Sequence, residues 1–140
     1  MRYSLVLALT IISAPAIAGT SQGYGQGGWF ERFQPVIDEH NSSGELMRIQ
    51  GHCQSNCTLF LGLRNVCVER SARLLFHAGH GRGPNRNVIN AGSTQRMMNA
   101  YNASLRQYLT DGRYMDTLAF HTVPGSQIID RFGYRECPRS

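Results

Sequence analysis

The sequence predicts one small α/β domain. Short apolar segments of strand length alternate along the chain with segments of helical periodicity, which is typical of sheets whose parallel strands are joined by helices. With 140 residues, the chain is long enough for one hydrophobic core but short for two. No internal repeat, long linker or low-complexity tract divides it. We therefore expect a single α/β domain with right-handed crossovers.

The N-terminal segment has the three parts of a secretory signal peptide. Arg2 supplies the positive charge, Leu5–Ile12 is apolar, and an Ala-Ile-Ala sequence ends at Ala18. The apolar run is shorter than the ~20 residues that a membrane-spanning helix needs. An uncleaved anchor is the alternative, but the small residues before Gly19 fit cleavage better. Residues 1–18 are therefore predicted to be a signal peptide.

The exported domain would comprise residues 19–140. Its first segment, 19–28, is rich in Gly, Gln and Ser and is expected to be a loose N-terminal arm. The domain is predicted to be periplasmic or secreted, without stable membrane insertion.

The first half of the domain contains two helical patterns and one strand. Apolar residues at helical spacing predict a helix over Trp29–Glu39, although Pro35 interrupts the pattern. Leu46–Gln50 is predicted to be a strand, followed by a break over 51–55. The dense apolar run Asn56–Leu63 suits a buried helix.

The second half continues with strands and then helices. Val66–Val68 and Arg73–His77 are predicted strands, and the Gly-, Asn- and Arg-rich segment 79–92 is predicted to be a loop. Ser93–Leu109 is predicted to be one helix with Ser93 as its N-cap. A last short helix is expected over Thr122–Phe132.

The positive charge comes entirely from arginine. All 14 basic residues are Arg, and the formal net charge is +5. The absence of lysine from the sequence excludes a Ser–Lys dyad, a Schiff-base lysine and a P-loop lysine. The arginines are scattered, and nucleic-acid binding would require a basic stripe with interleaved aromatics. We expect no nucleic-acid partner.

The four cysteines favour disulfides. They are Cys53, Cys57, Cys67 and Cys137, and an even number in an exported chain leaves three pairings open. A metal site is the alternative, because histidines lie nearby in the sequence, at His52, His77 and His80. However, Cys-x3-Cys without a second closely spaced ligand pair is not a usual zinc arrangement. We expect disulfides, no metal and no cofactor.

Ser55 is the residue in the sequence that most directly suggests chemistry. It follows a strand and a glycine turn and begins an apolar helix, where its hydroxyl can be exposed and the helix dipole favours an anion. The backbone N–H of Asn56 would face the same space, as a nucleophile with an oxyanion hole requires. The alternative is a helix N-cap, which is a common role for serine.

The segment around Ser55 resembles a known family. Residues 51–58 have the pattern Gly-x-Cys-x-Ser-x-Cys-Thr, which resembles the nucleophile turn of the Clp protease proteolytic subunit, and more closely exported Clp-like proteins of alphaproteobacteria. Val66–Val68 with the segment 72–77 resembles the strand pair that ends in the catalytic histidine. Gly27-Gly28 resembles the oxyanion turn, and 122–133 resembles the short helix and glycine near the family's end.

The resemblance implies a fold and a set of roles. The fold would be a crotonase-like spiral of βαβ units, truncated because the family's first strands are missing. Ser55 would be the nucleophile, His77 the base, and the backbone N–H groups of Gly28 and Asn56 the oxyanion donors. Asp116 lies nearest the expected position of the triad acid but out of register with it. Its rivals are Asp111, Asp130 and Glu136.

These observations predict an exported serine hydrolase that acts on peptides or a small acyl substrate. The alternative is a catalytically inactive Clp-like fold that binds a peptide or a partner chain, since a lost sheet edge invites pairing. A third hypothesis is a metal-binding module built from the Cys and His residues. Clp subunits form rings, but the ring contacts depend on parts that this chain lacks, so an oligomer is left open.

Overall fold

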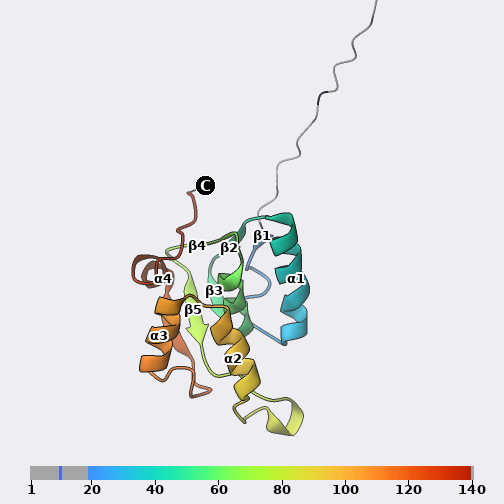
Figure 1. Ribbon diagram of the computed structural model, residues 1–140, viewed down its shortest axis with the longest axis vertical. Helices are drawn as coiled ribbons and strands as arrows, with labels where there is room; N and C mark the ends of the chain where they lie inside the picture. The colour runs from blue at the N-terminus through green and yellow to red at the C-terminus, as the bar shows by residue number, and fades with distance from the viewer. Residues whose placement is uncertain (1–9, 11–18, 140) are drawn as a thin grey trace, which may run out of the picture.

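The computed structural model describes Thr10 and residues 19–139 (Figure 1). The predicted signal peptide, residues 1–18, lies outside the described residues apart from Thr10. Along the described chain the elements follow in the order β1 (Gly19–Thr20), α1 (Phe30–Ser43), β2 (Met47–Ile49), β3 (His52–Gln54), η1 (Ser55–Gly62), β4 (Val66–Val68), β5 (Arg73–Phe76), η2 (Gly83–Asn85), α2 (Ala91–Asn99), α3 (Ala103–Asp111), β6 (His121–Pro124) and α4 (Gly125–Asp130).

The strands form two three-stranded sheets. In the first sheet β1, β2 and β4 are all parallel, and in the second β3 and β5 are parallel while β6 is antiparallel to β5. Figure 1 shows α1 on one side of the strands and α3 and α4 on the other. The predicted α/β class is confirmed, and the predicted strands Val66–Val68 and Arg73–His77 correspond to β4 and β5.

The predicted buried helix is a 3₁₀ helix, η1, and it begins at Ser55. Its residues from Cys57 to Leu61 are buried. It packs against α1, α2, β3, β4 and β5. These contacts fix the position of η1, because in a close-packed interior a helix cannot move without displacing the elements packed against it.

The prediction of a loose N-terminal arm is wrong. Gly19 and Thr20 pair in parallel with Met47 and Arg48. Ser21 is fully buried, and its hydroxyl donates to the Gln50 carbonyl and accepts from the Gln50 N–H. The edge of β2 supplies backbone partners for this segment, and unpaired buried backbone groups would be costly.

The predicted helix Ser93–Leu109 is two helices. Asn102 interrupts it with an extended backbone, and the Asn102 side chain accepts a hydrogen bond from Leu105 N–H at the start of α3. Asn90, not Ser93, caps α2 by accepting from the Ser93 N–H. Asparagine is among the strongest N-cap residues, which explains why α2 and α3 begin where they do.

The predicted helix Thr122–Phe132 is half strand. Its first residues belong to β6, where Leu74 pairs with Val123 and Phe76 with His121. The helix α4 begins only at Gly125. The free edge of β5 supplies ladder hydrogen bonds, and the strand buries Val123, so tertiary pairing overrides the local helix signal.

Two disulfides are present. Cys53 is joined to Cys57 and Cys67 to Cys137, which selects one of the three pairings that the sequence leaves open. The second bridge ties β4 to the C-terminal segment across 70 residues of sequence. Within the described residues, none of the helices combines the length and apolar character needed to cross a membrane.

Candidate active site

Ser55 and His77 directly follow two neighbouring parallel strands. Strand β3 ends at Gln54, which pairs with Leu75 of β5. Continuing this register places Ser55 opposite the last residue of β5, and His77 is the next residue along. In α/β sheets the carboxyl ends of parallel strands are where ligands bind. The two residues that the sequence paired as nucleophile and base therefore lie at the same sheet edge.

The backbone of Ser55 is in a conformation that non-glycine residues rarely adopt. Its φ is 54°, while Gln54 before it is extended. A serine at positive φ in a sharp strand-to-helix turn is the geometry that exposes the hydroxyl of a nucleophile elbow. Such strain costs on the order of 1–3 kcal/mol and persists only where its surroundings enforce it.

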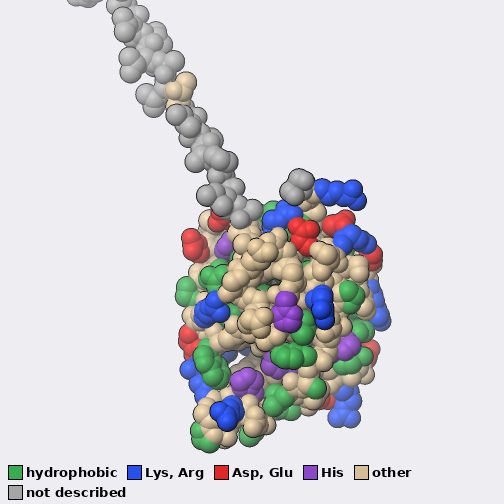
Figure 2. All heavy atoms as spheres, turned by 180° about the vertical axis from the view of Figure 1, so that it is seen from behind, with side chains coloured by type: hydrophobic (Ala, Val, Ile, Leu, Met, Phe, Trp, Pro, Cys, Tyr) green, Lys and Arg blue, Asp and Glu red, His purple; other side chains and the backbone are tan. Residues whose placement is uncertain are grey.

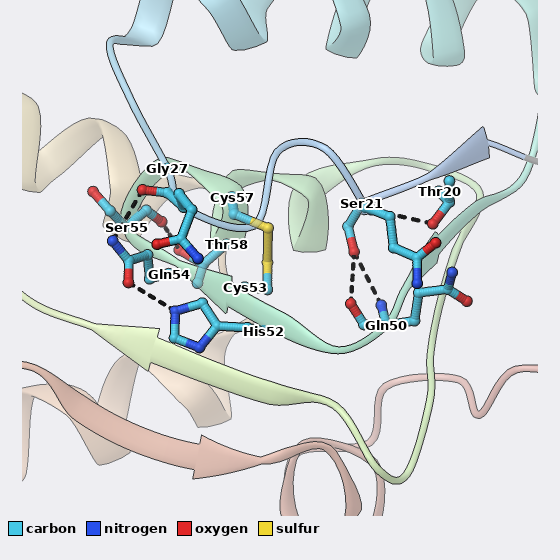
Figure 3. The surroundings of a disulfide bond; sticks show 12 residues. Thr20, Ser21, Gly27, Gln50, His52, Cys53, Gln54, Ser55, Cys57 and Thr58 are labelled. Carbon is cyan, nitrogen blue, oxygen red and sulfur yellow. Dashed lines mark hydrogen bonds between the residues drawn. A yellow bond between two sulfur atoms is a disulfide. The ribbon is translucent and has the colours of Figure 1, made fainter.

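Gly27 packs directly against this turn (Figure 3). A Cβ on Gly27 would lie 2.9 Å from the Ser55 Cβ and 3.0 Å from the Gln54 carbonyl oxygen. The φ of Gly27 is itself positive, at 73°. Only glycine has no Cβ to clash with Ser55 and adopts a positive φ without strain, so the Gly-Gly turn sets the position of Ser55.

Gly27→Ala is expected to destabilise the fold by at least about 1 kcal/mol and to lower the reactivity of Ser55. Gly23→Ala is the matched control, because Gly23 also has a positive φ, at 87°, but an added Cβ there meets nothing within 4 Å. Urea denaturation and the rate of covalent modification of Ser55 would be measured for both variants. Equal reactivity of the two variants would contradict a positioning role for Gly27.

The predicted oxyanion residues are joined to each other. The Asn56 side chain donates from Nδ2 to the Gly28 carbonyl oxygen at 2.7 Å. Within the described part of the chain, neither the Gly28 nor the Asn56 backbone N–H donates to another backbone group outside the helices and strands. Both residues line the same cavity as Ser55 and His77. Two such N–H donors are what an oxyanion hole requires.

The His77 side chain is buried, with 5% of its surface exposed, and both ring nitrogens lack a hydrogen-bond partner among the described residues. Its ring packs edge-on to Phe120, with the centroids 4.9 Å apart. Burial lowers the pKa of His77 below its ordinary value, and the neighbouring His80 lowers it further. A neutral imidazole is the form that accepts a proton.

A cavity of about 530 Å³ joins these residues. Ser55, Asn56, Gly28 and His77 contribute to its lining. Its other aromatic and charged lining residues are Trp29, Phe30, Glu31, His80, Arg82, Arg96 and Phe120. In the view from behind, a hollow bordered by histidine side chains is visible in the lower half of the molecule (Figure 2). The cavity volume is within the range of small-ligand sites.

A buried hydrogen-bond chain holds the Ser55 carbonyl. The Thr58 hydroxyl donates to the Ser55 carbonyl oxygen at 2.6 Å and lies 2.6 Å from the Tyr101 hydroxyl. Because Thr58 uses its one hydroxyl hydrogen on the Ser55 carbonyl, the Tyr101 hydroxyl donates to Thr58, and burial raises the pKa of Tyr101. Sequence reasoning missed these supporting residues. Thr58 belongs to the Gly-x-Cys-x-Ser-x-Cys-Thr pattern, but nothing local connects it to Tyr101.

The Cys53–Cys57 disulfide spans Ser55 (Figure 3). Both sulfur-bearing residues are fully buried beneath the turn, while Ser55 is half-exposed. Ser55 lines the cavity beside this bridge. The bridge therefore restrains the turn on both sides without closing access to the hydroxyl.

Asp116 is not brought to His77. Its carboxylate accepts a hydrogen bond from Arg113 Nε at 3.0 Å, and 59% of its side-chain surface is exposed. The Thr117 carbonyl next to it accepts from the Ala78 N–H, so the two backbones are adjacent. The side chain nevertheless points to Arg113, and the ring of His77 receives no carboxylate from it.

The three rival acids also have other partners. Asp111 accepts from the Gln107 side chain, and Asp130 and Glu136 both pair with Arg70. None of these carboxylates lines the cavity of Ser55. The structure thus brings together a serine, a histidine and two backbone donors, but it places none of the four predicted acids against the histidine.

The histidines and cysteines of the metal alternative are dispersed. All four cysteines are consumed by disulfides. His52 is bonded to the Gln54 side chain and His80 to the Gly81 carbonyl. Among the residues that the structure describes, no three or more His, Cys, Asp or Glu side chains are grouped to hold a metal ion.

The site thus combines a serine at a strained strand-to-helix turn with a histidine at the end of the next parallel strand, and both line one cavity. Comparison with protein-family models, with curated proteins and with solved structures finds no match to this chain.

Proposed function

We propose that this protein is an exported serine hydrolase in which Ser55 is the nucleophile and neutral His77 the base. The observation that carries the proposal is the positive φ of Ser55 at a turn that opens onto a cavity shared with His77. Strained residues of this kind concentrate at functional sites. A serine that served only as a helix cap would have an extended backbone and a side-chain hydrogen bond to the helix.

The proposed reaction is acyl transfer to water. The Ser55 Oγ attacks the carbonyl carbon, its proton passes to His77, and the carbonyl oxygen becomes an oxyanion facing the N–H groups of Gly28 and Asn56. His77 then gives that proton to the departing amine or alcohol as its bond to the carbonyl carbon breaks. Water then attacks the acyl-serine carbonyl as His77 takes its proton, and His77 returns that proton to the Ser55 Oγ as the ester bond breaks and the acid leaves. No cofactor takes part in these steps.

Ser55 and His77 share the cavity but are not hydrogen-bonded to each other within the described structure. The proton transfer therefore requires rotation of one side chain or a bridging water. Catalytic hydrogen bonds are often long in a site without substrate and shorten when the reacting group is bound.

The finer fold and the location belong to the same proposal. We infer a crotonase-like arrangement, and the pairs of parallel strands β2–β4 and β3–β5 support it. Export is supported by the two disulfides, since such bonds persist in oxidising compartments.

The test is covalent labelling by a fluorophosphonate. Attack by the Ser55 oxygen on phosphorus expels fluoride, and one adduct per chain is expected, located on Ser55 by peptide mass mapping. Ser55→Ala should give no adduct, and Ser126→Ala, which alters a serine of α4 outside the cavity, should label like the unaltered protein. An unlabelled but folded wild-type chain would reject the proposal.

One observation favours the inactive binding module as a second candidate. His77 receives no carboxylate from the described residues, although an acid normally orients the histidine of a triad. In that case the cavity would bind a peptide or partner chain without chemistry. Ser55→Ala would then leave both folding and partner binding unchanged, and the fluorophosphonate would label neither protein.

A further inference from the structure

The charges on the cavity wall do not balance. Glu31 accepts from Arg82 through both carboxylate oxygens, at 2.5 Å each. Arg96 also lines the cavity, but it takes part in no ion pair and no hydrogen bond among the described residues. Counting its carboxylate and its two arginines, the cavity wall therefore carries one excess positive charge, and that charge is on Arg96.

The Arg96 side chain is held in place by an aromatic ring. Its guanidinium carbon lies 4.0 Å above the centroid of the Phe30 ring. A guanidinium stacked in this way keeps its N–H edges free, and these edges match the two oxygens of a carboxylate. The fixed position reduces the ordering cost of binding a carboxylate there.

Next to this charge the cavity has exposed aromatic walls. Trp29 and Phe120 line it, and they are 47% and 50% exposed. Large aromatic side chains usually bury most of their surface, so two of them at one cavity indicate an apolar contact surface for a ligand. The wall therefore combines apolar area with one free cation.

We propose that Arg96 is a specificity-determining residue that selects acyl substrates with an apolar body and a carboxylate. This inference rests on the proposed function of Ser55. The acyl carbonyl would face Ser55, the apolar body would contact Trp29 and Phe120, and the carboxylate would pair with Arg96. Because Arg96 is exposed, we expect a preference of about tenfold that shrinks with added salt.

The experiment compares two fluorophosphonates of equal chain length, one ending in a carboxylate and the other in a carboxamide. The second-order rate of Ser55 modification should be about tenfold higher for the carboxylate probe. Arg96→Gln should reduce this ratio to about one. Arg131→Gln should leave it unchanged, because Arg131 also stacks on an aromatic ring, that of Tyr108, but does not line the cavity.

A ratio near one in the wild type, or a preference retained in Arg96→Gln, would overturn the proposal. If neither probe reacts, the proposed function of Ser55 fails. The role of Arg96 is then tested by the equilibrium binding of a carboxylate and of its amide to the cavity. Suberate should shift NMR signals of the cavity residues at lower concentration than suberamide, and Arg96→Gln should abolish the difference. Equal binding of the two compounds would overturn the assignment of Arg96.

Discussion

Replacing His77 by Ala is expected to slow fluorophosphonate modification of Ser55 by at least about 100-fold, the usual contribution of a general base. Serine is a weak nucleophile until a neighbouring group accepts its proton. Among the residues lining the cavity with Ser55, His77 is the base that directly follows the adjacent parallel strand. The effect should therefore be close to complete, while the fold is retained.

The controls separate loss of the base from loss of structure. His77→Gln fills more of the buried space than Ala and should be as slow as His77→Ala. His121→Gln should react at the wild-type rate, because His121 pairs with Tyr108 and lies outside the cavity. If His77→Gln and the wild type react equally fast, His77 is not the base.

Removing the Cys67–Cys137 disulfide is expected to lower the free energy of unfolding by about 4 kcal/mol, through the entropy that its 70-residue span gives back to the unfolded chain. That is a large share of the stability of a small domain. The same change at Cys53–Cys57, which spans four residues, should cost about 2 kcal/mol. Urea denaturation of the two double-alanine variants under non-reducing conditions measures both values.

The two disulfides should differ in their effect on reactivity. Loss of Cys53–Cys57 frees the turn that holds Ser55 at positive φ, so labelling should become slower even in fully folded protein. Loss of Cys67–Cys137 removes the covalent link between β4 and the C-terminal segment, which keeps its backbone hydrogen bonds to Val68, and it leaves the cavity lining intact. Equal stability of the two variants, or equal labelling, would contradict these separate roles.

The location of the site could be predicted from the sequence because short runs of neighbouring residues determine the turn at Ser55 and the strand before His77. A glycine turn, a serine and an apolar run mark a strand-to-helix turn, and a second apolar strand ending in His77 marks its neighbour. These patterns need no knowledge of distant contacts. The structure places Ser55, Asn56, His77 and Gly28 along one cavity, as the sequence suggested.

The rest of the site depends on contacts between distant segments. Arg96 lies on α2 and Phe30 on α1, and their stacking follows from packing that no local pattern reveals. Similarly, position in the sequence favours Asp116 as the triad acid, but its side chain is paired with Arg113. The break at Asn102 was missed because a strong N-cap was hidden within a continuous helical periodicity.

The most direct test of the account is the pH profile of Ser55 modification by the fluorophosphonate. Burial lowers the pKa of His77, so protonation, which would remove the base, occurs only below the ordinary histidine range. The rate should rise with pH to a plateau with its midpoint below about 6.5. The cavity is also lined by His80, Glu31, Arg82 and Arg96, and comparison with His77→Gln separates their contribution to the profile from that of His77. A profile that rises without a plateau and is the same in His77→Gln would contradict activation of Ser55 by His77.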